Sequence, residues 1–382
     1  MKIKLSDKIL VILFFCSLLL PSIIYFFVSP NIKKENMDNR KLADFPLLNS
    51  LTITKFPEKF DKYYADNLPF RNQQIYLYSY ILYKLTGSLK SSNVIIGKDK
   101  WLFYNNVKSG NPVADYKRIN QFTLKELIKI KDNLNSLEKY CKEKNCSFTL
   151  IICPNKENIY TEYMPESIIR TNNISRTQQL IKYLRENTDI KVVYPYSELI
   201  EAKKDNFIYY KNDTHWNLLG GYIASKLLLE NFDIELPNYS SLKIELNNEK
   251  TSCDLANMYI VKQEFKEPYN INITGYTKLN IQRKESKDIP KNLKNFPGGK
   301  FEIRDYCKDA PKNEKIMMVR DSFGIAMIPV ISCNYKNSVY VHCDKFKKNM
   351  IDDEKPNVFV LEIVERHLPS LASKKYNFNN KK

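Results

Sequence analysis

A regular alternation of strand-type and helical segments, which begins near residue 120, is the feature that most constrains how this chain can fold. Short apolar runs of strand length are separated by segments whose apolar residues recur at helical spacing. Strands and helices that alternate in this way form a parallel sheet with helices on both faces. The runs predicted as strands are 147–153, 191–194, 207–210, 315–319, 337–342 and 358–364.

The helical segments between these strands carry recognisable signals. Thr123-Leu-Lys-Glu126 is a capping-box sequence, and apolar residues follow it at helical spacing as far as Cys141. Gly220 and Gly221 fall in another helical segment, where we expect them to allow close packing. Besides the segment after Thr123, helices are predicted at 176–187, 196–204, 217–229 and 323–332.

Residues 231–312 interrupt the alternation. They are polar, rich in Asn and Lys, and contain several prolines, so we expect an insertion of irregular or β character that could form one wall of a substrate groove. The alternating pattern resumes after the insertion, which places the main domain at 111–370. The Lys- and Asn-rich residues 371–382 are expected to form a disordered tail.

Residues 9–28 form an apolar run of the length that crosses about 30 Å of hydrocarbon. The lysines of residues 1–8 favour a cytoplasmic N-terminus, although Lys33 and Lys34 on the far side weaken that bias. No small-x-small cleavage site follows the run. The sequence therefore predicts a cytoplasmic tail at 1–8, an uncleaved transmembrane signal anchor at 9–28 that crosses the cell membrane once, and an extracytoplasmic remainder.

Residues 31–110 are predicted to form a membrane-proximal arm of short elements, because prolines interrupt any long helix there. Within this arm, residues 72–86 are apolar and have helical spacing. Apolar residues on both sides of the Gly97-Lys-Asp-Lys100 turn indicate a hairpin over 95–104.

The charge of the chain restricts its partners. Sixty Lys and Arg against 43 Asp and Glu give a net charge of +17, which could attract nucleic acid, anionic lipid or an acidic polymer. A lysine-rich solvated surface is the simpler interpretation. Placement outside the cytoplasm argues against nucleic acid and leaves the membrane surface or a cell-envelope polymer.

The cysteines give no disulfide framework. Cys16 lies in the apolar run, so seven of the eight cysteines remain, and an odd number cannot pair fully. Cys141 with Cys146, or Cys333 with Cys343, are possible bridges, but the connectivity cannot be read from the sequence. No Cys-x-x-Cys pair or His-rich cluster is present, so we expect neither a metal nor a cofactor.

Two short stretches carry residues suited to acyl-transfer chemistry. Asp213 lies two residues before His215, one of three histidines, and Ser322 follows the run 315–319 at a sharp turn. In acyl transfer an imidazole takes the proton of a hydroxyl nucleophile, and a carboxylate orients the imidazole. Because parallel strands end at one edge of the sheet, the three residues can converge there although they are far apart in sequence.

A structural role for the same residues is the competing interpretation. Asp321 or Ser322 could merely cap the following helix, and His215 could be a hydrogen-bonded core histidine. Spacing alone slightly favours this interpretation. Against it, backbone N–H groups at a helix start beside Ser322 would suit a tetrahedral oxyanion.

The residues around both stretches resemble a known family. Asp213-Thr-His-Trp-Asn217 with the Gly-Gly pair after it, together with Val319-Arg-Asp-Ser-Phe-Gly324, is similar to the SGNH-hydrolase-like domain of the alginate O-acetylation proteins of AlgX and AlgJ type and of the related DHHW proteins. The resemblance covers roughly residues 36–370 and implies a flavodoxin-like α/β fold. Further stretches that agree are Asn39-Arg40 to Pro46, Gly97 to Tyr104, Cys153-Pro-Asn-Lys156 through Tyr160, Asp254-Leu-Ala-Asn257 and Ile363-Val-Glu-Arg366.

The resemblance implies a membrane-anchored, extracytoplasmic O-acetyltransferase with a Ser-His-Asp triad. Ser322 would attack the acetyl donor, His215 would act as general base and then general acid, and Asp213 would orient His215. A hydroxyl of a cell-surface polysaccharide would then take the acetyl group from the serine. In such systems a multi-pass membrane acyltransferase is thought to supply the acetyl group, so the resemblance also implies a membrane partner.

The sequence departs from the family pattern at several positions. Arg320 stands where many SGNH enzymes have glycine, and the usual oxyanion glycine and asparagine blocks are not identifiable. Asn155, Lys156 and Asn217 are candidates for oxyanion donors or substrate contacts, although a surface or structural role is the simpler reading of each. Arg320 could bind an anionic sugar or pair with an acid.

Two other classes of function remain open from the sequence. An esterase that removes acetyl groups would use the same triad and would differ only in whether water reaches the acyl-enzyme. A non-catalytic scaffold that binds or assembles polysaccharide would need no triad, so three intact candidate residues argue against it.

Overall fold

The computed structural model of the chain divides into two compact units, residues 1–90 and residues 91–382. The hairpin predicted within the arm is part of the second unit, so the division falls earlier than the expected boundary between residues 110 and 111. The structure describes residues 4–28, 41–47, 53–68, 70–87, 89, 93–247, 253–259, 261–267, 270–276, 279–284 and 301–378.

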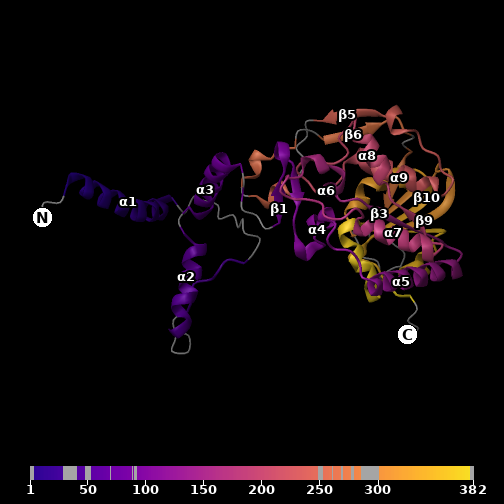
Figure 1. Ribbon diagram of the computed structural model, residues 1–382, viewed down its shortest axis with the longest axis horizontal. Helices are drawn as coiled ribbons and strands as arrows, with labels where there is room; N and C mark the ends of the chain where they lie inside the picture. The colour runs from indigo at the N-terminus through magenta and orange to yellow at the C-terminus, as the bar shows by residue number, and fades with distance from the viewer. Residues whose placement is uncertain are drawn as a thin grey trace. The chain divides into compact units, whose positions relative to one another are not determined.

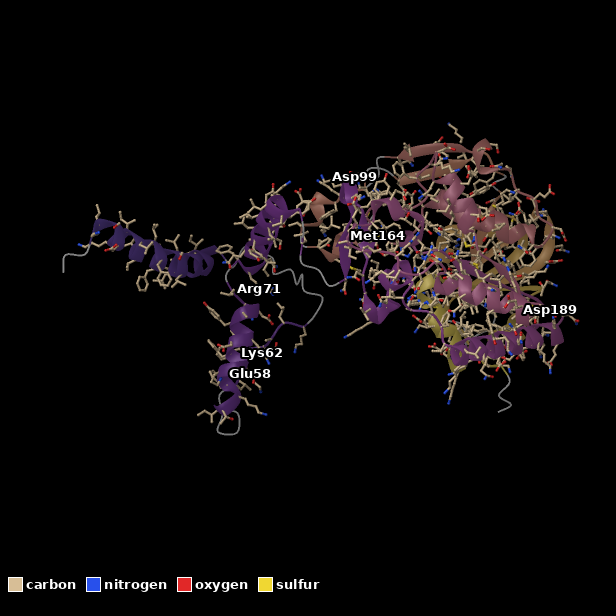
Figure 2. The ribbon with its side chains drawn as sticks, viewed as in Figure 1. Glu58, Lys62, Arg71, Asp99, Met164 and Asp189 are labelled. Atoms are coloured by element: carbon tan, nitrogen blue, oxygen red, sulfur yellow. The ribbon has the colours of Figure 1, made fainter. Side chains whose placement is uncertain are left out.

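The described part of the first unit is helical. Helix α3 confirms the helix predicted at 72–86, and it ends at Gly87, whose φ of 67° is the left-handed conformation that glycine readily adopts after a helix. On α2 the Glu58 and Lys62 side chains lie one turn apart and form an ion pair with an O–N distance of 2.6 Å (Figure 2). The helices are α1 (Leu5–Val28), α2 (Phe56–Asp66) and α3 (Arg71–Thr86), with a 3-10 turn, η2 (Ile53–Lys55), before α2.

The predicted transmembrane anchor is not supported. Residues 9–28 lie in α1, which begins at Leu5 and therefore also takes in Asp7 and Lys8 from the expected cytoplasmic tail. Among the helices of the described residues, none is long and apolar enough to cross a membrane. Residues 31–40, 48–52, 69, 88 and 90–92 of the predicted arm lie outside the described residues.

A seven-stranded mixed sheet forms the centre of the second unit. Its strand order is β4-β3-β11-β9-β10-β8-β7. The first five strands are parallel to one another. Strand β8 pairs antiparallel with β10, and β7 pairs antiparallel with β8 at the edge of the sheet. The strands are β3 (Ser147–Cys153), β4 (Lys191–Val193), β7 (Ile281–Lys284), β8 (Glu302–Cys307), β9 (Lys312–Arg320), β10 (Tyr335–His342) and β11 (Val358–Val364).

Helices cover both faces of this sheet, which confirms the expected α/β architecture (Figure 1). Along β11, Val358, Val360 and Val364 pack into one apolar core, whereas the intervening Phe359 and Leu361 pack into the other. The first core contains residues of α8 (Tyr196–Ala202), α9 (Leu218–Glu230) and α10 (Ile328–Ser332), and the second contains residues of α5 (Leu124–Glu143), α7 (Arg176–Asn187) and α11 (Asn349–Glu354).

Smaller elements complete the unit. The predicted hairpin is confirmed as β1 (Val94–Ile96) and β2 (Leu102–Tyr104), which are joined by the 3-10 turn η3 (Lys98–Lys100). A second hairpin pairs β5 (Lys243–Asn247) with β6 (Asn270–Thr274). The remaining short helices are α4 (Pro112–Lys117) and α6 (Lys156–Ile159).

The structure confirms the predicted capping box and most of the predicted strands. The capping box is formed, because Thr123 Oγ1 accepts the Glu126 N–H at 3.3 Å and the Glu126 carboxylate accepts the Thr123 N–H at 2.8 Å. Strands are present at 147–153, 191–193, 312–320, 335–342 and 358–364, within a few residues of their predicted bounds. All eight cysteines are free thiols, so neither possible bridge is formed.

Two predicted elements differ from the structure. Residues 207–210 do not join the sheet; the chain turns back there, and a single bridge links Tyr209 to Trp216. The helix predicted at 323–332 is a 3-10 helix, η12 (Phe323–Met327), followed by α10. Pro329 lies in the first turn of α10, where its missing N–H costs no helical hydrogen bond.

The predicted insertion has β character, which was one of its two expected forms, and the predicted tail is more regular than expected. Residues 281–284 and 302–307 of the insertion form β7 and β8, which is why the sheet is mixed and not wholly parallel. At the C-terminus, 3-10 turns continue to Tyr376, and both Tyr376 and Phe378 are buried in the second core. Residues 379–382 lie outside the described residues.

Gly221 lets α9 approach η12, the element that begins directly after Ser322. A Cβ atom on Gly221 would lie 2.6 Å from the Ala326 Cβ and 2.7 Å from the Ala326 carbonyl oxygen. Gly220 has a similar constraint, since its Cβ would lie 2.5 Å from the Ile208 carbonyl oxygen. The expectation that this glycine pair permits close packing is therefore confirmed.

We predict that Gly221→Ala lowers the free energy of unfolding by about 2 kcal/mol, because the added methyl group overpacks the contact with Ala326. Urea unfolding of the full chain measures the change. Glu230→Ala, at the exposed end of the same helix, is the matched control and should change stability by less than about 0.5 kcal/mol. Equal stability of Gly221→Ala and the control would contradict the packing argument.

Candidate active site

Ser322 lies on a tight turn between β9 and η12. The preceding residue holds this turn, because the Asp321 carboxylate accepts the Phe323 N–H at 2.8 Å and the Val364 N–H at 2.9 Å. Ser322 itself remains partly exposed. The fold thus places a serine hydroxyl at the carboxyl end of a central strand and leaves it accessible.

Asp213 and His215 lie on a second tight turn, which precedes α9. The turn is closed by the Tyr210 N–H, which donates to the His215 carbonyl at 3.2 Å, and by the bridge between Tyr209 and Trp216. The His215 N–H also donates to Asp213 Oδ1 at 3.0 Å. Two-residue spacing therefore lets one carboxylate bind both the backbone and the ring of the same histidine.

The structure brings Asp213, His215 and Ser322 together. His215 Nδ1 lies 2.6 Å from Asp213 Oδ1, and His215 Nε2 lies 2.7 Å from Ser322 Oγ. With Nδ1–H donating to the carboxylate, Nε2 of a neutral imidazole is the acceptor for the serine O–H. The imidazole is 27% exposed, so a substrate can reach the atoms between histidine and serine.

The environment of Asp213 keeps its carboxylate ionised. Burial would raise the pKa of Asp213, but the hydrogen bond and charge of His215 outweigh burial and bring this pKa to about 2. The second carboxylate oxygen accepts the Asp254 N–H at 2.8 Å. An ionised, fixed carboxylate can stabilise the imidazolium that forms when His215 takes a proton.

Asp254 is a second carboxylate beside His215, and we did not assign it a role from the sequence. Its Oδ1 accepts the Thr214 N–H at 2.8 Å, and its Oδ2 accepts the Thr214 hydroxyl at 2.5 Å and lies 3.7 Å from His215 Nδ1. Burial and the charge of Asp213 raise the pKa of Asp254. The only sequence signal was the Asp254-Leu-Ala-Asn257 stretch, because no spacing rule connects it to residue 215.

Lys156 hydrogen-bonds to the backbone of the turn that carries Asp213 and His215. Its fully buried ammonium group donates to the carbonyls of Tyr210, Lys211 and Asp213 at 3.2, 3.1 and 2.5 Å. The ammonium group also lies 5.4 Å from the centre of the Phe103 ring. All three donors of the lysine are directed at the backbone of the turn, so the structure places Lys156 as a positioning residue.

The other three candidates are also buried. Asn155 donates its backbone N–H to Glu365 at 2.7 Å and its side-chain amide to Asp115 at 3.2 Å. Asn217 caps α9, since its side-chain oxygen accepts the N–H groups of the second and third residues after it. Arg320 is 1% exposed and donates to the Asp321 carbonyl at 3.2 Å.

The backbone N–H groups after Ser322 differ from the expected helix start. The Phe323 N–H is engaged by the Asp321 carboxylate, and the following element is a short 3-10 helix. Below this turn, Glu362 accepts the Asp321 N–H at 2.8 Å, and burial raises the pKa of Glu362 far above its ordinary value. Burial therefore disfavours a second negative charge next to the Asp321 carboxylate.

A cleft of about 410 Å³ opens beside Ser322. It is large enough for part of a sugar chain, since ligand pockets typically measure about 300–1,000 Å³. His367, Lys375 and His342 are among the residues that line it. The His367 ring also lies 3.8 Å from the Asp321 carboxylate.

Two clusters in the described part of the chain bring three possible metal ligands within 4.8 Å of one another. One consists of His342, Cys343 and Asp344 at the cleft, and the other consists of Asp213, His215 and Asp254. In the second cluster the Asp213 and Asp254 carboxylates and the His215 ring already hydrogen-bond to neighbouring protein groups. Proton transfer is therefore the chemistry that this arrangement supports directly.

Comparison with known proteins supports the resemblance seen in the sequence. Residues 94–280 match the family described as SGNH hydrolase-like domain, acetyltransferase AlgX. This stretch includes Asp213 and His215 and ends before Ser322. The probable alginate O-acetylase AlgJ of Pseudomonas putida is 21% identical over 191 residues, which are 50% of this chain and 47% of that protein. The chain thus spans about half the length of this relative.

Solved structures show the same fold. A DHHW family protein from Eubacterium siraeum superimposes with a TM-score of 0.54 at 16% identity, over 77% of this chain and 98% of that chain. PatB1 of Bacillus cereus superimposes with a TM-score of 0.52 at 16% identity, over 75% of this chain and 100% of that chain. These two structures share the fold, and the match of residues 94–280 confirms the resemblance to the SGNH-like domain of the AlgX type.

We predict that Lys156→Met lowers the free energy of unfolding by about 3 kcal/mol, because three carbonyls of the turn lose the ammonium donor while the apolar contacts of the side chain are kept. Urea unfolding measures the loss, and faster amide hydrogen exchange at 210–216 would locate it. Lys129→Met, on the exposed face of α5, is the control. Unchanged exchange in the turn would rule out the positioning role.

The stability of the chain should depend on the charge of Asp321. Burial alone would raise the pKa of Asp321, but the nearby His367 ring, the Arg366 charge and two backbone N–H groups lower it to about 2. A depressed pKa stabilises the fold above the unfolded value of 3.8, and the contribution is lost as pH falls through the folded value.

We therefore predict that Asp321→Asn costs about 2 kcal/mol at pH 6, and that its difference from the wild type shrinks by about 1 kcal/mol at pH 3. Urea unfolding at both pH values gives the two differences. Asp189→Asn, on the surface, should show neither effect. A difference that stays constant with pH would mean that the Asp321 carboxylate is not held ionised.

Proposed function

We propose that this chain, which carries an SGNH hydrolase-like domain of the AlgX type, is an O-acetyltransferase that moves an acetyl group through an acetyl-serine intermediate to a hydroxyl of a cell-surface polysaccharide. We place its action outside the cytoplasm. The acetyl donor in this proposal is a multi-pass membrane acyltransferase, which would deliver acetyl groups to Ser322.

One observation supports this proposal above all others. An unbroken chain of short hydrogen bonds runs from the Asp213 carboxylate through the His215 ring to the Ser322 hydroxyl, with lengths of 2.6 and 2.7 Å. The three residues come from two turns separated by more than a hundred positions. A merely structural histidine would not need an ionised carboxylate on one ring nitrogen and a partly exposed serine on the other.

The chemistry follows from this geometry. Ser322 Oγ attacks the acetyl carbonyl carbon while His215 Nε2 takes the hydroxyl proton. The tetrahedral intermediate collapses when the bond to the leaving group breaks, and the leaving group takes the proton back from His215. The product is an acetyl ester on Ser322.

The second half of the reaction reverses these roles. A sugar hydroxyl gives its proton to His215 and attacks the acetyl-serine carbonyl, and Ser322 leaves with the proton from His215. Throughout both halves Asp213 stays ionised and faces the imidazolium. The net result is one acetyl group moved from donor to sugar and a regenerated enzyme.

Three further observations support a polysaccharide acceptor. The cleft beside Ser322 has the volume for part of a sugar chain. A relative is named a probable alginate O-acetylase. The net charge of +17 suits a polymer or membrane surface that carries negative charge.

We predict that Ser322→Ala and His215→Ala each lower acetyl transfer at least about a thousandfold, and that Asp213→Asn has a similar effect because the histidine loses its orienting charge. Mass spectrometry of acetyl groups on the sugar and on Ser322 measures transfer by the full chain. Ser167→Ala, at an exposed serine, is the control, and near-UV circular dichroism shows whether each variant is folded. Wild-type activity in all three variants would refute the triad.

The same assay separates transfer from hydrolysis. A chromogenic acetyl ester is supplied with and without oligosaccharides. Acetylated sugar that disappears in Ser322→Ala is the expected result. Ester cleavage that depends on Ser322 and never yields acetylated sugar would instead identify an esterase.

A further inference from the structure

His367 shares the cleft with Ser322 and lies just beyond the neighbouring strand of the sheet. Ser322 follows β9 and His367 follows β11, and these two strands are adjacent and parallel. The Asp321 carboxylate joins their ends, because it accepts the Val364 N–H at 2.9 Å. Both Ser322 and His367 line the cleft of about 410 Å³. The fold therefore brings a second histidine into the space beside the nucleophile.

The His367 ring is partly exposed in this cleft and has one polar neighbour. Its Nδ1 lies 3.8 Å from the ionised Asp321 carboxylate, which is longer than a hydrogen bond. Among the described residues, no group donates to or accepts from this ring at a shorter distance. The side chain is 37% exposed. An imidazole in this position can bind a hydroxyl group, either as donor or as acceptor.

The charged side chains that line the cleft already have partners within the protein. They are Asp321, Asp344, Glu362 and Lys375. The Asp321 and Glu362 carboxylates accept backbone N–H groups, and Lys375 donates to a backbone carbonyl. Asp344 lies 3.6 Å from the His342 ring. A hydrogen bond to the His367 ring is therefore a contact that a sugar hydroxyl can gain here without displacing one of these pairs.

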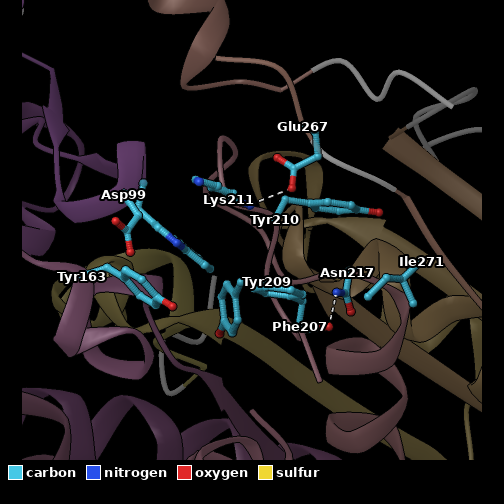
Figure 3. A pocket seen from close by; sticks show the side chains of 10 residues that line it. Asp99, Tyr163, Phe207, Tyr209, Tyr210, Lys211, Asn217, Glu267 and Ile271 are labelled. Atoms are coloured by element: carbon cyan, nitrogen blue, oxygen red, sulfur yellow. Dashed lines mark hydrogen bonds between the residues drawn. The ribbon is translucent and has the colours of Figure 1, made fainter. Parts of the chain in front are cut away.

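A second cavity, of about 280 Å³, lies against the turn that carries Asp213 and His215 (Figure 3). Its described lining includes neither Ser322 nor a histidine. The Glu267 carboxylate there accepts two backbone N–H groups of the turn, each at 2.9 Å. That carboxylate thus supports the turn. Because Ser322 lines the cleft and not this cavity, the cleft is the approach to an acetyl group on Ser322.

We propose that His367 binds a second hydroxyl of the acceptor sugar, and so selects acceptors that carry a hydroxyl next to the one that is acetylated. The inference rests on the proposed function, because it needs an acetyl group on Ser322. The attacking hydroxyl gives its proton to His215, and the neighbouring hydroxyl hydrogen-bonds to the His367 ring. This second contact holds the attacking oxygen toward the acetyl carbonyl carbon. No proton is transferred at His367.

The separation of the two histidines suits two hydroxyls of one sugar ring. His215 Nε2 lies 2.7 Å from Ser322 Oγ, and the His367 ring lies beside the carboxylate of the residue that precedes Ser322. A hydrogen bond between an imidazole and a hydroxyl favours the acceptor that can form it by about tenfold. A sugar that lacks the neighbouring hydroxyl loses this advantage.

Two small alcohols test the selection directly. The full chain is supplied with para-nitrophenyl acetate as acetyl donor and with either vicinal trans-cyclohexanediol or cyclohexanol as acceptor. These two alcohols share one ring and differ only in the neighbouring hydroxyl. Mass spectrometry of the acetylated alcohols should show transfer to the diol about ten times faster per hydroxyl. Equal transfer to both alcohols, or no transfer to the diol, would overturn the assignment.

Substitutions then locate the contact. His367→Phe keeps a ring but removes the hydrogen bond, so the preference for the diol should disappear. His367→Gln can still donate and accept, and it should keep a preference of several-fold. Lys374→Gln, at an exposed residue outside the described lining of the cleft, is the control and should keep the full preference. Full preference in His367→Phe would show that another group binds the neighbouring hydroxyl.

The first half of the reaction separates acceptor selection from a structural role. The burst of para-nitrophenol reports formation of acetyl-Ser322, which needs no acceptor, so it should change less than about threefold in both His367 variants. Equal losses in this step and in transfer would mean that His367 only supports the Ser322 turn. Absence of acetyl-Ser322 in the wild type would refute the proposed function and this inference with it. Acetyl-Ser322 without preference for the diol would refute the role of His367 alone.

Discussion

A single buried ammonium group determines the shape of the candidate active site. Lys156 directs its three donors at the carbonyls of Tyr210, Lys211 and Asp213, in a place where burial lowers its pKa and nearby carboxylates oppose that change. Hydrogen bonds from a charged donor are strong where water is excluded. The turn before α9 is not held by the hydrogen bonds of a β-sheet. The ammonium group of Lys156, which begins α6 shortly after β3 ends, stabilises the turn instead.

The parallel sheet explains why this support and the serine meet. Val364 of β11 pairs with Cys153 of β3, and Leu361 of β11 pairs with Val319 of β9. The carboxyl ends of all three parallel strands therefore lie at the same end of the sheet. The residues just beyond them are joined across strands: the Asn155 N–H donates to Glu365, and Asp321 accepts the Val364 N–H. Backbone N–H groups beyond the sheet hydrogen bonds are thus bound by carboxylates at the carboxyl end of the strands, where Ser322 lies.

The parts of the fold that are predictable from sequence are those with purely apolar patterns. The central strands β3, β9 and β11 must be apolar on both faces, and their runs stand out. The run of strand β8 does not stand out, because the strand buries three charged residues. Glu302 pairs with Arg304, Arg304 also pairs with Glu354, and Asp305 pairs with Arg283. Residues 207–210 were predicted as a strand because they are apolar, but Ile208 and Tyr209 are buried without forming one. Asp254 escaped assignment because only the tertiary fold brings it to His215.

Asp254 also shows how two carboxylates can face one imidazole without competing for it. Asp213 is largely buried, receives the ring at 2.6 Å and has a pKa of about 2, whereas Asp254 is 35% exposed, lies at 3.7 Å and has a raised pKa. Environments that push two pKa values apart assign different roles to the two groups. Asp213 is the ionised partner of the histidine. Asp254 accepts both the N–H and the hydroxyl of Thr214 and so fixes the residue that lies between Asp213 and His215.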